Sequence, residues 1–318
     1  MQKVSVLYIA GATRSGGTLL GQILGSLPGF CYAGELQYLW AESVAENEPC
    51  ACGARLSTCQ LWRDVLNRVV GGPERADLPA LMELQRSVAR ERYVPMLALF
   101  NRVPGDFARA KLPQKFGALT AALYQAIAEA SGASVIIDSS RAACRPFVLA
   151  RLPEIDLRVI HIVRDPRAVA FSWTRRKVQF QTPEGAKRME QWGLVYSALH
   201  WTWNNFWSKQ LRSVRSGRRG YALLRYEDMI ARPAHSIART LADLGLEPPD
   251  LAPIGGPKLR LGLTHALRTN PVRFVSGEIE LNPDEEWRTA MKGQGRRLVT
   301  ALTWPLLRGY GYPPWRSG

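Results

Sequence analysis

A glycine-rich segment near the start of the chain has the residue types and spacing needed to hold a phosphate or a sulfonate. Residues 11–18 read Gly-Ala-Thr-Arg-Ser-Gly-Gly-Thr, directly after the apolar run 4–10 and before residues with helical spacing. Backbone N–H groups of such a loop, at the N-terminus of a helix, bind anions. The pattern matches the nucleotide P-loop G-x-x-x-x-G-K-[ST], except that Gly17 replaces the lysine.

The missing lysine narrows the chemistry of this loop. In kinases and NTPases that lysine reaches the β and γ phosphates, so the loop lacks the group used in γ-phosphoryl transfer. Arg14 is a candidate replacement cation, because a guanidinium can fork onto two oxygens of one phosphate or sulfonate. A turn that only connects a strand to a helix is the alternative. The residues predicted to surround the anion are Arg14, Ser15, Gly16, Gly17, Thr18 and Leu19.

A second group of phosphate-binding residue types follows another strand-like run, 157–163. Asp165 suits a helix N-cap and Pro166 the first helical position. Arg164 therefore leaves the C-terminal end of a strand, where open α/β sheets bind ligands. Ser172 lies about two turns into the helix on the same face as Asp165. A guanidinium and a hydroxyl suit a phosphate dianion, although an N-capped helix with surface ion pairs would have the same pattern.

These two segments resemble the donor-binding motifs of the sulfotransferases that use PAPS (3′-phosphoadenosine 5′-phosphosulfate). Arg-Ser-Gly-Gly-Thr-Leu-Leu at 14–20 is similar to the 5′-phosphosulfate loop of the carbohydrate and bacterial branches, with Gly17 in place of a hydroxyl residue. Residues 159–172 resemble the 3′-phosphate motif, in which the positions of Arg164 and Ser172 hold the phosphate. The resemblance implies transfer of a sulfonate from PAPS to a hydroxyl or an amine, with PAP (3′-phosphoadenosine 5′-phosphate) as the product.

Two later segments extend the resemblance. Arg-Tyr-Glu-Asp at 225–228 is similar to a family segment whose tyrosine lies near the adenine, which implies that role for Tyr226. Asn-Pro-Val-Arg-Phe at 270–274 is similar to a run in bacterial members, and it implies that Arg273, with Asn270, covers the phosphate end of the nucleotide. From the residues alone, Tyr226 could equally be a core tyrosine, and Arg273 could belong to a surface ion pair.

The acceptor must lose a proton, and Glu35 is the predicted general base. A carboxylate whose pKa rises in a partly dry cleft can do this work, and the resemblance implies a glutamate base after this helix. Histidine is the alternative base: His161 is expected in the core, whereas His200 and His265 remain candidates. Arg14 is expected to neutralise the leaving 5′-phosphate. Because loop amides and arginine match the single charge of a sulfonate, no metal is expected to be required.

Two further residues are candidates for contact with the acceptor. Arg141 falls where many relatives carry a lysine at the cleft, so the resemblance implies contact with the sulfonate or the acceptor. His265, near the 270–274 run, is the other candidate. Asp138 stands where a Walker B carboxylate would stand, but without the P-loop lysine we expect a turn or cap residue.

Three of the five cysteines cluster as Cys50, Cys52 and Cys59. They could form a zinc site with Cys31 as the fourth ligand, but the spacing is not one of the familiar zinc patterns. We therefore expect packing thiols beside a tight glycine turn, with no metal among the site residues. A disulfide stays open, although a reducing compartment disfavours it.

The strand-like runs 4–10, 134–138, 157–163 and 221–225 alternate with helical segments. This alternation predicts one α/β domain over 1–318, with a central, mainly parallel sheet flanked by helices, as in P-loop proteins. Residues 74–131 are rich in Leu, Ala and Arg with helical periodicity. They predict a helical insertion that could shape the acceptor pocket.

The amino-acid composition limits the class of partner that the protein can bind. Lys and Arg outnumber Asp and Glu by 42 to 27 over 318 residues, a net charge of +15 that fits an anionic partner or general solubility. No apolar run is long enough to span a membrane and no signal peptide is evident, so a cytoplasmic protein is expected. The alternatives are a P-loop phosphoryl transferase and a non-catalytic protein that binds nucleotides or nucleic acid. Against nucleic acid, the sequence lacks the regular aromatic pattern of single-strand binding proteins. The acceptor, whether small molecule, glycan or lipid, and the oligomeric state are not specified.

Overall fold

The computed structural model describes residues 3–88, 90–101, 113–140, 142–175, 178–182, 185–188, 190–213, 220–256, 258–268 and 270–314. Arg141 lies outside the described residues, and so does its predicted contact with the acceptor.

Five parallel strands form the central sheet, in the order β2-β3-β1-β4-β7. The strands are β1 (Val4–Ala10), β2 (Phe30–Gly34), β3 (Val135–Asp138), β4 (Ile155–Val163) and β7 (Tyr221–Arg225). Because all five run in the same direction, their C-terminal ends lie at one edge: Ala10 pairs with His161, Gly34 with Asp138, and Val163 with Arg225. The predicted α/β fold with a parallel sheet is confirmed.

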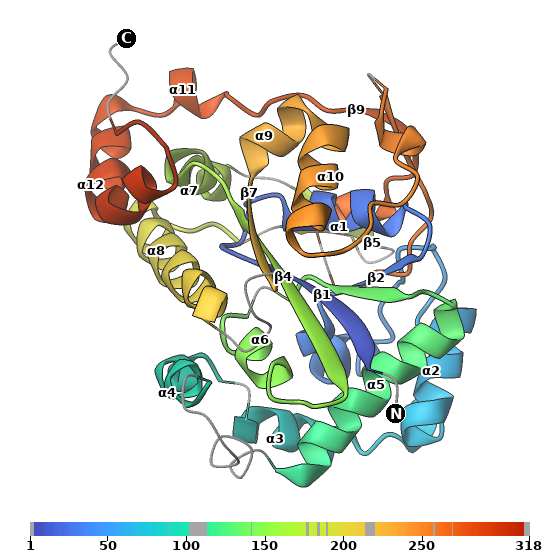
Figure 1. Ribbon diagram of the computed structural model, residues 1–318. Helices are drawn as coiled ribbons and strands as arrows, with labels where there is room; N and C mark the ends of the chain where they lie inside the picture. The colour runs from blue at the N-terminus through green and yellow to red at the C-terminus, as the bar shows by residue number, and fades with distance from the viewer. Residues whose placement is uncertain are drawn as a thin grey trace.

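The sheet has a hydrophobic core on each face, and β1 contributes alternate residues to both. Val6, Tyr8 and Ala10 pack on the side of α2, α5 and α6. Leu7 and Ile9 pack on the opposite side with α1 and α10. The strand is therefore apolar throughout, as expected for a sheet that is covered on both faces. Figure 1 shows α1, α9 and α10 above the strands and α2, α3 and α5 below them.

The helices of these layers are α1 (Gly17–Gly25), α2 (Gln60–Val70), α3 (Leu78–Val88), α4 (Val94–Phe100), α5 (Gln114–Ser131), α6 (Cys144–Leu149), α9 (Tyr226–Ala231) and α10 (Pro233–Asp243). A further group lies beside the sheet at the left of Figure 1, comprising α7 (Pro166–Thr174), α8 (Leu194–Gln210), α11 (Trp287–Ala290) and α12 (Gly293–Gly309). Two further two-stranded antiparallel sheets pair β5 (Val178–Thr182) with β6 (Gly185–Arg188) and β8 (Lys258–Leu261) with β9 (Gly277–Glu280).

Two differences from the sequence analysis concern the central sheet and its core, and the short strands β5, β6, β8 and β9 were not predicted either. Strand β2 was not predicted, because a five-residue run that ends in Ala-Gly gives little alternation. The block 74–131, predicted as an insertion, contributes α5 to the main core, where Leu123, Tyr124 and Ile127 are buried against the sheet. The last third of that block is therefore a layer of the fold.

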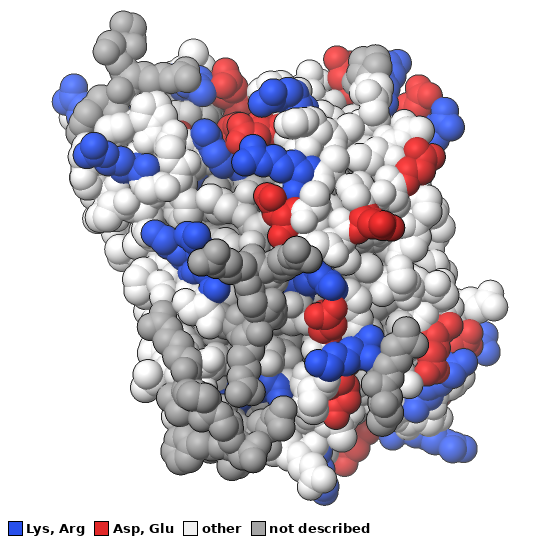
Figure 2. All heavy atoms as spheres, viewed as in Figure 1, with Lys and Arg blue, Asp and Glu red and all other residues white. Residues whose placement is uncertain are grey.

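Surface charge is mixed on the face shown in Figure 2, where basic and acidic side chains are interspersed. No described helix is both long enough and apolar enough to cross a lipid bilayer.

Candidate active site

The residues singled out by the sequence gather at the C-terminal edge of the parallel sheet. The glycine loop follows β1, Glu35 follows β2, Asp138 ends β3, Arg164 follows β4 and Tyr226 follows β7. Parallel strands place these chain segments side by side although they are far apart in sequence. This edge is also where open α/β sheets bind ligands.

Two positions of the loop, Gly11 and Gly16, have no room for any residue larger than glycine. A Cβ on Gly11, which has φ +127°, would lie 2.2 Å from the carbonyl oxygen of Ile162. A Cβ on Gly16, which has φ +92°, would lie 2.4 Å from the ring of Tyr226. Arg14 also has a positive φ of 68°, which is uncommon for a residue with a side chain. The loop is therefore a tight, fixed turn pressed against the ends of β4 and β7.

The loop holds polar groups that the protein itself does not satisfy. Among the described residues, the hydroxyl oxygens of Thr13 and Ser15 are buried without a hydrogen-bond partner. Helix α1 begins at Gly17, its N-cap Gly16 supplies no capping side chain, and its first turn has no acidic residue. The first N–H groups of a helix have no partner within it. Buried groups left unsatisfied cost about 1–3 kcal/mol each, so this cradle fits an anionic group that accepts several hydrogen bonds.

The two predicted anion-binding clusters meet. Nη1 of Arg164 donates a hydrogen bond of 3.2 Å to the carbonyl oxygen of Arg14, inside the loop. The Arg14 guanidinium lies over the ring of Trp173, 4.5 Å from its centroid, and the Arg164 guanidinium lies 4.5 Å from the centroid of Tyr226. The structure thus brings Arg14, Arg164 and Tyr226 together at a single place.

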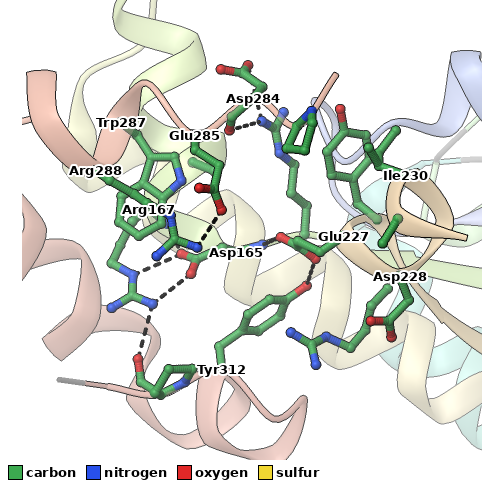
Figure 3. A pocket seen from close by; sticks show the side chains of 17 residues that line it. Asp165, Arg167, Glu227, Asp228, Ile230, Asp284, Glu285, Trp287, Arg288 and Tyr312 are labelled. Carbon is green, nitrogen blue, oxygen red and sulfur yellow. Dashed lines mark hydrogen bonds and ion pairs between the residues drawn. The ribbon is translucent and has the colours of Figure 1, made fainter. Parts of the chain in front are cut away.

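A cavity of about 370 Å³ opens beside Arg164 and Tyr226. Figure 3 shows that its polar wall is an ordered network. Asp165 caps α7 by accepting from the backbone N–H of Arg167, as predicted, and also pairs with that guanidinium at 2.6 Å. Glu227 accepts from the backbone N–H of Asp165 and from the hydroxyl of Tyr312, at 3.1 and 2.7 Å. Burial raises the pKa of Tyr312, which keeps this hydroxyl protonated as a donor.

Ser172 is buried on α7 but is not among the described residues that line this cavity. Its predicted contact with the 3′-phosphate stays a prediction.

Asp284, which the sequence did not single out, forms an ion pair with Arg164, the residue predicted to bind the phosphate. Its Oδ2 lies 3.1 Å from Nη2 of Arg164 and 2.7 Å from Nη2 of Arg175. Burial alone would raise the pKa of Asp284, but the two guanidiniums outweigh burial and hold that pKa below its ordinary value. No local pattern could reveal this contact, because the partners lie 120 positions apart.

Glu35 stands at the end of β2, two strands away from β1, and is largely buried. Its backbone N–H donates to the carbonyl oxygen of Leu267 at 3.0 Å. Gly34 before it has φ +89°, and a Cβ there would lie 2.1 Å from the same oxygen. The turn that carries Glu35 is therefore fixed by the segment around Leu267, and the role of Glu35 as base stays a prediction.

Asp138 has the turn role that the sequence analysis favoured. Its Oδ1 accepts from the backbone N–H of Ser140 at 2.8 Å, and its Oδ2 accepts from Nε of Arg145 at 2.8 Å and from the hydroxyl of Tyr124. All of these side chains are buried, so this carboxylate is fully engaged inside the protein.

The histidines divide between the core and a cysteine cluster. His161 is buried between the Tyr221 hydroxyl and the Asn205 side chain, and burial lowers its pKa to about 4, so it is the core histidine that was predicted. His200 lies on α8 against Trp192. His265 presents Nδ1 to the sulfurs of Cys50 and Cys59, and its roles as an acceptor contact or a base stay predictions.

Arg273 and Asn270 lie next to α1. Asn270 caps a short 3-10 helix (Pro271–Phe274) by accepting from the N–H of Val272. The carbonyl oxygen of Arg273 accepts from Gln22 of α1 at 2.7 Å, and its buried guanidinium pairs with Glu48 at 3.3 Å. The sequence left open an ion pair at the surface, whereas the pair that forms is buried. The contact with a nucleotide stays a prediction.

The geometry defines a class, an α/β protein with an anion cradle at its first strand–helix turn, and comparison with known proteins gives the family. A model of the sulfotransferase family matches residues 7–250, and the chain therefore belongs to that family. Membership implies sulfotransferase activity with PAPS as donor.

Two solved structures share the fold. The sulfotransferase domain of the Synechococcus PCC 7002 olefin synthase is 19% identical with a TM-score of 0.53, covering 98% of this chain and 96% of that one. The sulfotransferase domain from the curacin biosynthetic pathway is 17% identical with a TM-score of 0.50, covering 98% of this chain and 100% of that one. No curated protein matches the sequence.

Proposed function

We propose that this sulfotransferase moves a sulfonate from PAPS to a hydroxyl or an amine of its acceptor by in-line displacement that requires no metal. The observation that carries the proposal is the hydrogen bond from Arg164 to the carbonyl oxygen of Arg14, which joins the two donor motifs at one edge of the sheet. One nucleotide can then span both clusters. The bound nucleotide would supply the sulfonate that is transferred and the 5′-phosphate that leaves.

The residues of the loop would hold the 5′ end. The orphaned hydroxyls of Thr13 and Ser15 and the first N–H groups of α1 can donate to the phosphosulfate oxygens. Arg14 supplies a cation as negative charge grows on the leaving phosphate. At the other end, Arg164 and Ser172 would hold the 3′-phosphate, and Tyr226 would lie against the adenine.

Glu35 would accept the proton of the acceptor. Its turn is buried and its backbone is held by Leu267, which fixes the point at which the side chain leaves the chain. A base within reach of the attacking group typically contributes a factor of about 10²–10⁴ in rate.

A thermal-shift titration with PAP and with ATP tests the donor, since selective stabilisation by PAP is expected for a ligand that binds only the folded state. Turnover then tests the base. Glu35→Ala should keep PAP affinity and lose about 10²-fold or more in kcat. Glu83→Ala, on the exposed face of α3, is the control and should keep both. Normal turnover by the Glu35 variant would refute the base, and equal shifts with ATP and PAP would refute the donor.

A further inference from the structure

Four potential metal ligands converge away from the glycine loop. Cys50, Cys52, Cys59 and His265 each place one ligand atom so that all four atoms lie within 4.8 Å of one another. The sequence analysis favoured packing thiols, with Cys31 as the only candidate for a fourth ligand. That candidate was wrong, because Cys31 lies on β2 outside the group and a histidine from the distant C-terminal region takes the place.

The distances match the edges of a zinc tetrahedron. The sulfur of Cys59 lies 3.7 Å from that of Cys52 and 3.8 Å from that of Cys50. Nδ1 of His265 lies 3.3 Å from the Cys59 sulfur and 3.6 Å from the Cys50 sulfur. Zinc bonds of about 2.3 Å to sulfur and 2.0–2.1 Å to nitrogen place tetrahedral ligands about 3.6–3.8 Å apart. Three of these four distances therefore fit, the one from His265 to Cys59 is shorter, and no bond joins the sulfurs.

The backbone presents the three sulfurs to one point. Cys50 and Cys52 lie on a tight turn, in which the N–H of Gly53 donates to the carbonyl oxygen of Cys50 at 2.9 Å. Gly53 has φ +89°, the left-handed conformation that glycine adopts at no steric cost. Cys59 is the N-cap of α2, where the positive end of the helix stabilises a thiolate.

The histidine side is fixed by separate contacts. The carbonyl oxygen of His265 accepts from Nε1 of Trp62 at 2.8 Å, and the N–H of Ala51 donates to the carbonyl oxygen of Ala266 at 3.1 Å. Trp62 lies in the first turn of α2, so the same helix end supports the cysteines and the histidine. The segment beside His265 is in this way held against the cysteine turn before any metal is considered.

We propose that Cys50, Cys52, Cys59 and His265 form a Cys₃His zinc site with a structural role. Four protein ligands fill a tetrahedral zinc, which leaves no open position for substrate. The site ties the turn before α2 to a segment some 215 positions later in the chain. Two residues beyond His265, Leu267 bonds to the backbone of Glu35, so the metal would also steady the turn that carries this glutamate. The assignment holds whether or not Glu35 is the base.

Metal analysis of the full chain, purified without chelators, tests the proposal. We expect one zinc per chain by plasma mass spectrometry. His265→Ala and Cys59→Ala should lower the zinc content severalfold, whereas His265→Cys, which rebuilds the site with four thiolates, should retain it. Cys31→Ala and Cys144→Ala are matched controls, because both thiols are buried outside the group, and they should keep full zinc.

A second measurement covers variants that fail to fold. Cobalt incorporated into the unaltered chain should give a thiolate charge-transfer band and the strong visible bands of a tetrahedral site. Purified chain that holds no zinc and takes none up when it is added would overturn the proposal. So would a disulfide between two of the three cysteines in freshly isolated protein, another metal at full occupancy, or unchanged zinc in Cys59→Ala. None of these readouts depends on sulfotransferase activity.

Discussion

Among the arginine–aspartate pairs at the C-terminal edge of the sheet, one after β3 and one after β4 differ in their surroundings. In the pair after β3, Arg145 and Asp138 expose 7% and 0% of their side chains and also bond to Tyr124. In the pair after β4, Arg164 is equally buried at 7%, but its partner Asp284 is 30% exposed and lies at the cavity. The first pair has every partner inside the protein, whereas the second faces a space that a ligand can enter. We infer that the closed pair maintains the fold and that the open pair exchanges its carboxylate for a phosphate.

The largest expected effect is on stability, at the closed pair. Asp138→Ala leaves the Arg145 guanidinium buried without its carboxylate, which should cost about 3–5 kcal/mol in the free energy of unfolding. Urea titration measures the loss. Asp156→Ala removes an ion pair with Arg158. Because the Asp156 side chain is 43% exposed, this change should cost less than about 1 kcal/mol in the free energy of unfolding. Equal losses in the two variants would contradict the comparison.

At the open pair, the effect should appear in binding. Arg164→Ala should weaken PAP by roughly 10- to 100-fold, because hydrogen bonds to charged groups contribute about 1.5–3 kcal/mol. Isothermal titration calorimetry gives the affinity. Arg158→Ala is the control and should leave PAP affinity unchanged. Arg158 is a partly buried arginine in the N-terminal half of β4, whereas Arg164 follows the C-terminal end of that strand. If Arg164→Ala bound PAP as tightly as the unaltered chain, Arg164 would not be a phosphate ligand.

The smallest effect should have the opposite sign. The lowered pKa of Asp284 keeps it ionised at neutral pH, where it competes with a phosphate for Arg164. Asp284→Asn should therefore strengthen PAP binding by about two- to fivefold, the roughly 0.5–1 kcal/mol of a partly exposed pair. Glu286→Gln changes a carboxylate that pairs with Arg175 and not with Arg164, and should have little effect. Weaker binding by the Asp284 variant would mean that this carboxylate supports the site.

The sequence was most informative where a feature depends on neighbouring residues. The strand, glycine turn and helix at 4–25 were predicted from local pattern, and so was the capped start of α7 at Asp165. Strand β2 was missed because it is short and carries weak alternation, although it positions Glu35. The core role of α5 was missed because helical periodicity does not show which surface a helix covers.

By itself, the sequence determined the local backbone of the glycine loop and the family of the chain, because glycine positions, caps and strand patterns act over a few adjacent residues. Only the tertiary structure decided that Asp284 forms an ion pair with Arg164 and that His265 lies beside the three cysteines. Those contacts join residues that are 120 and about 215 positions apart. They arise from the way the C-terminal segments pack across the edge of the sheet, and no spacing within a short window of sequence encodes that packing.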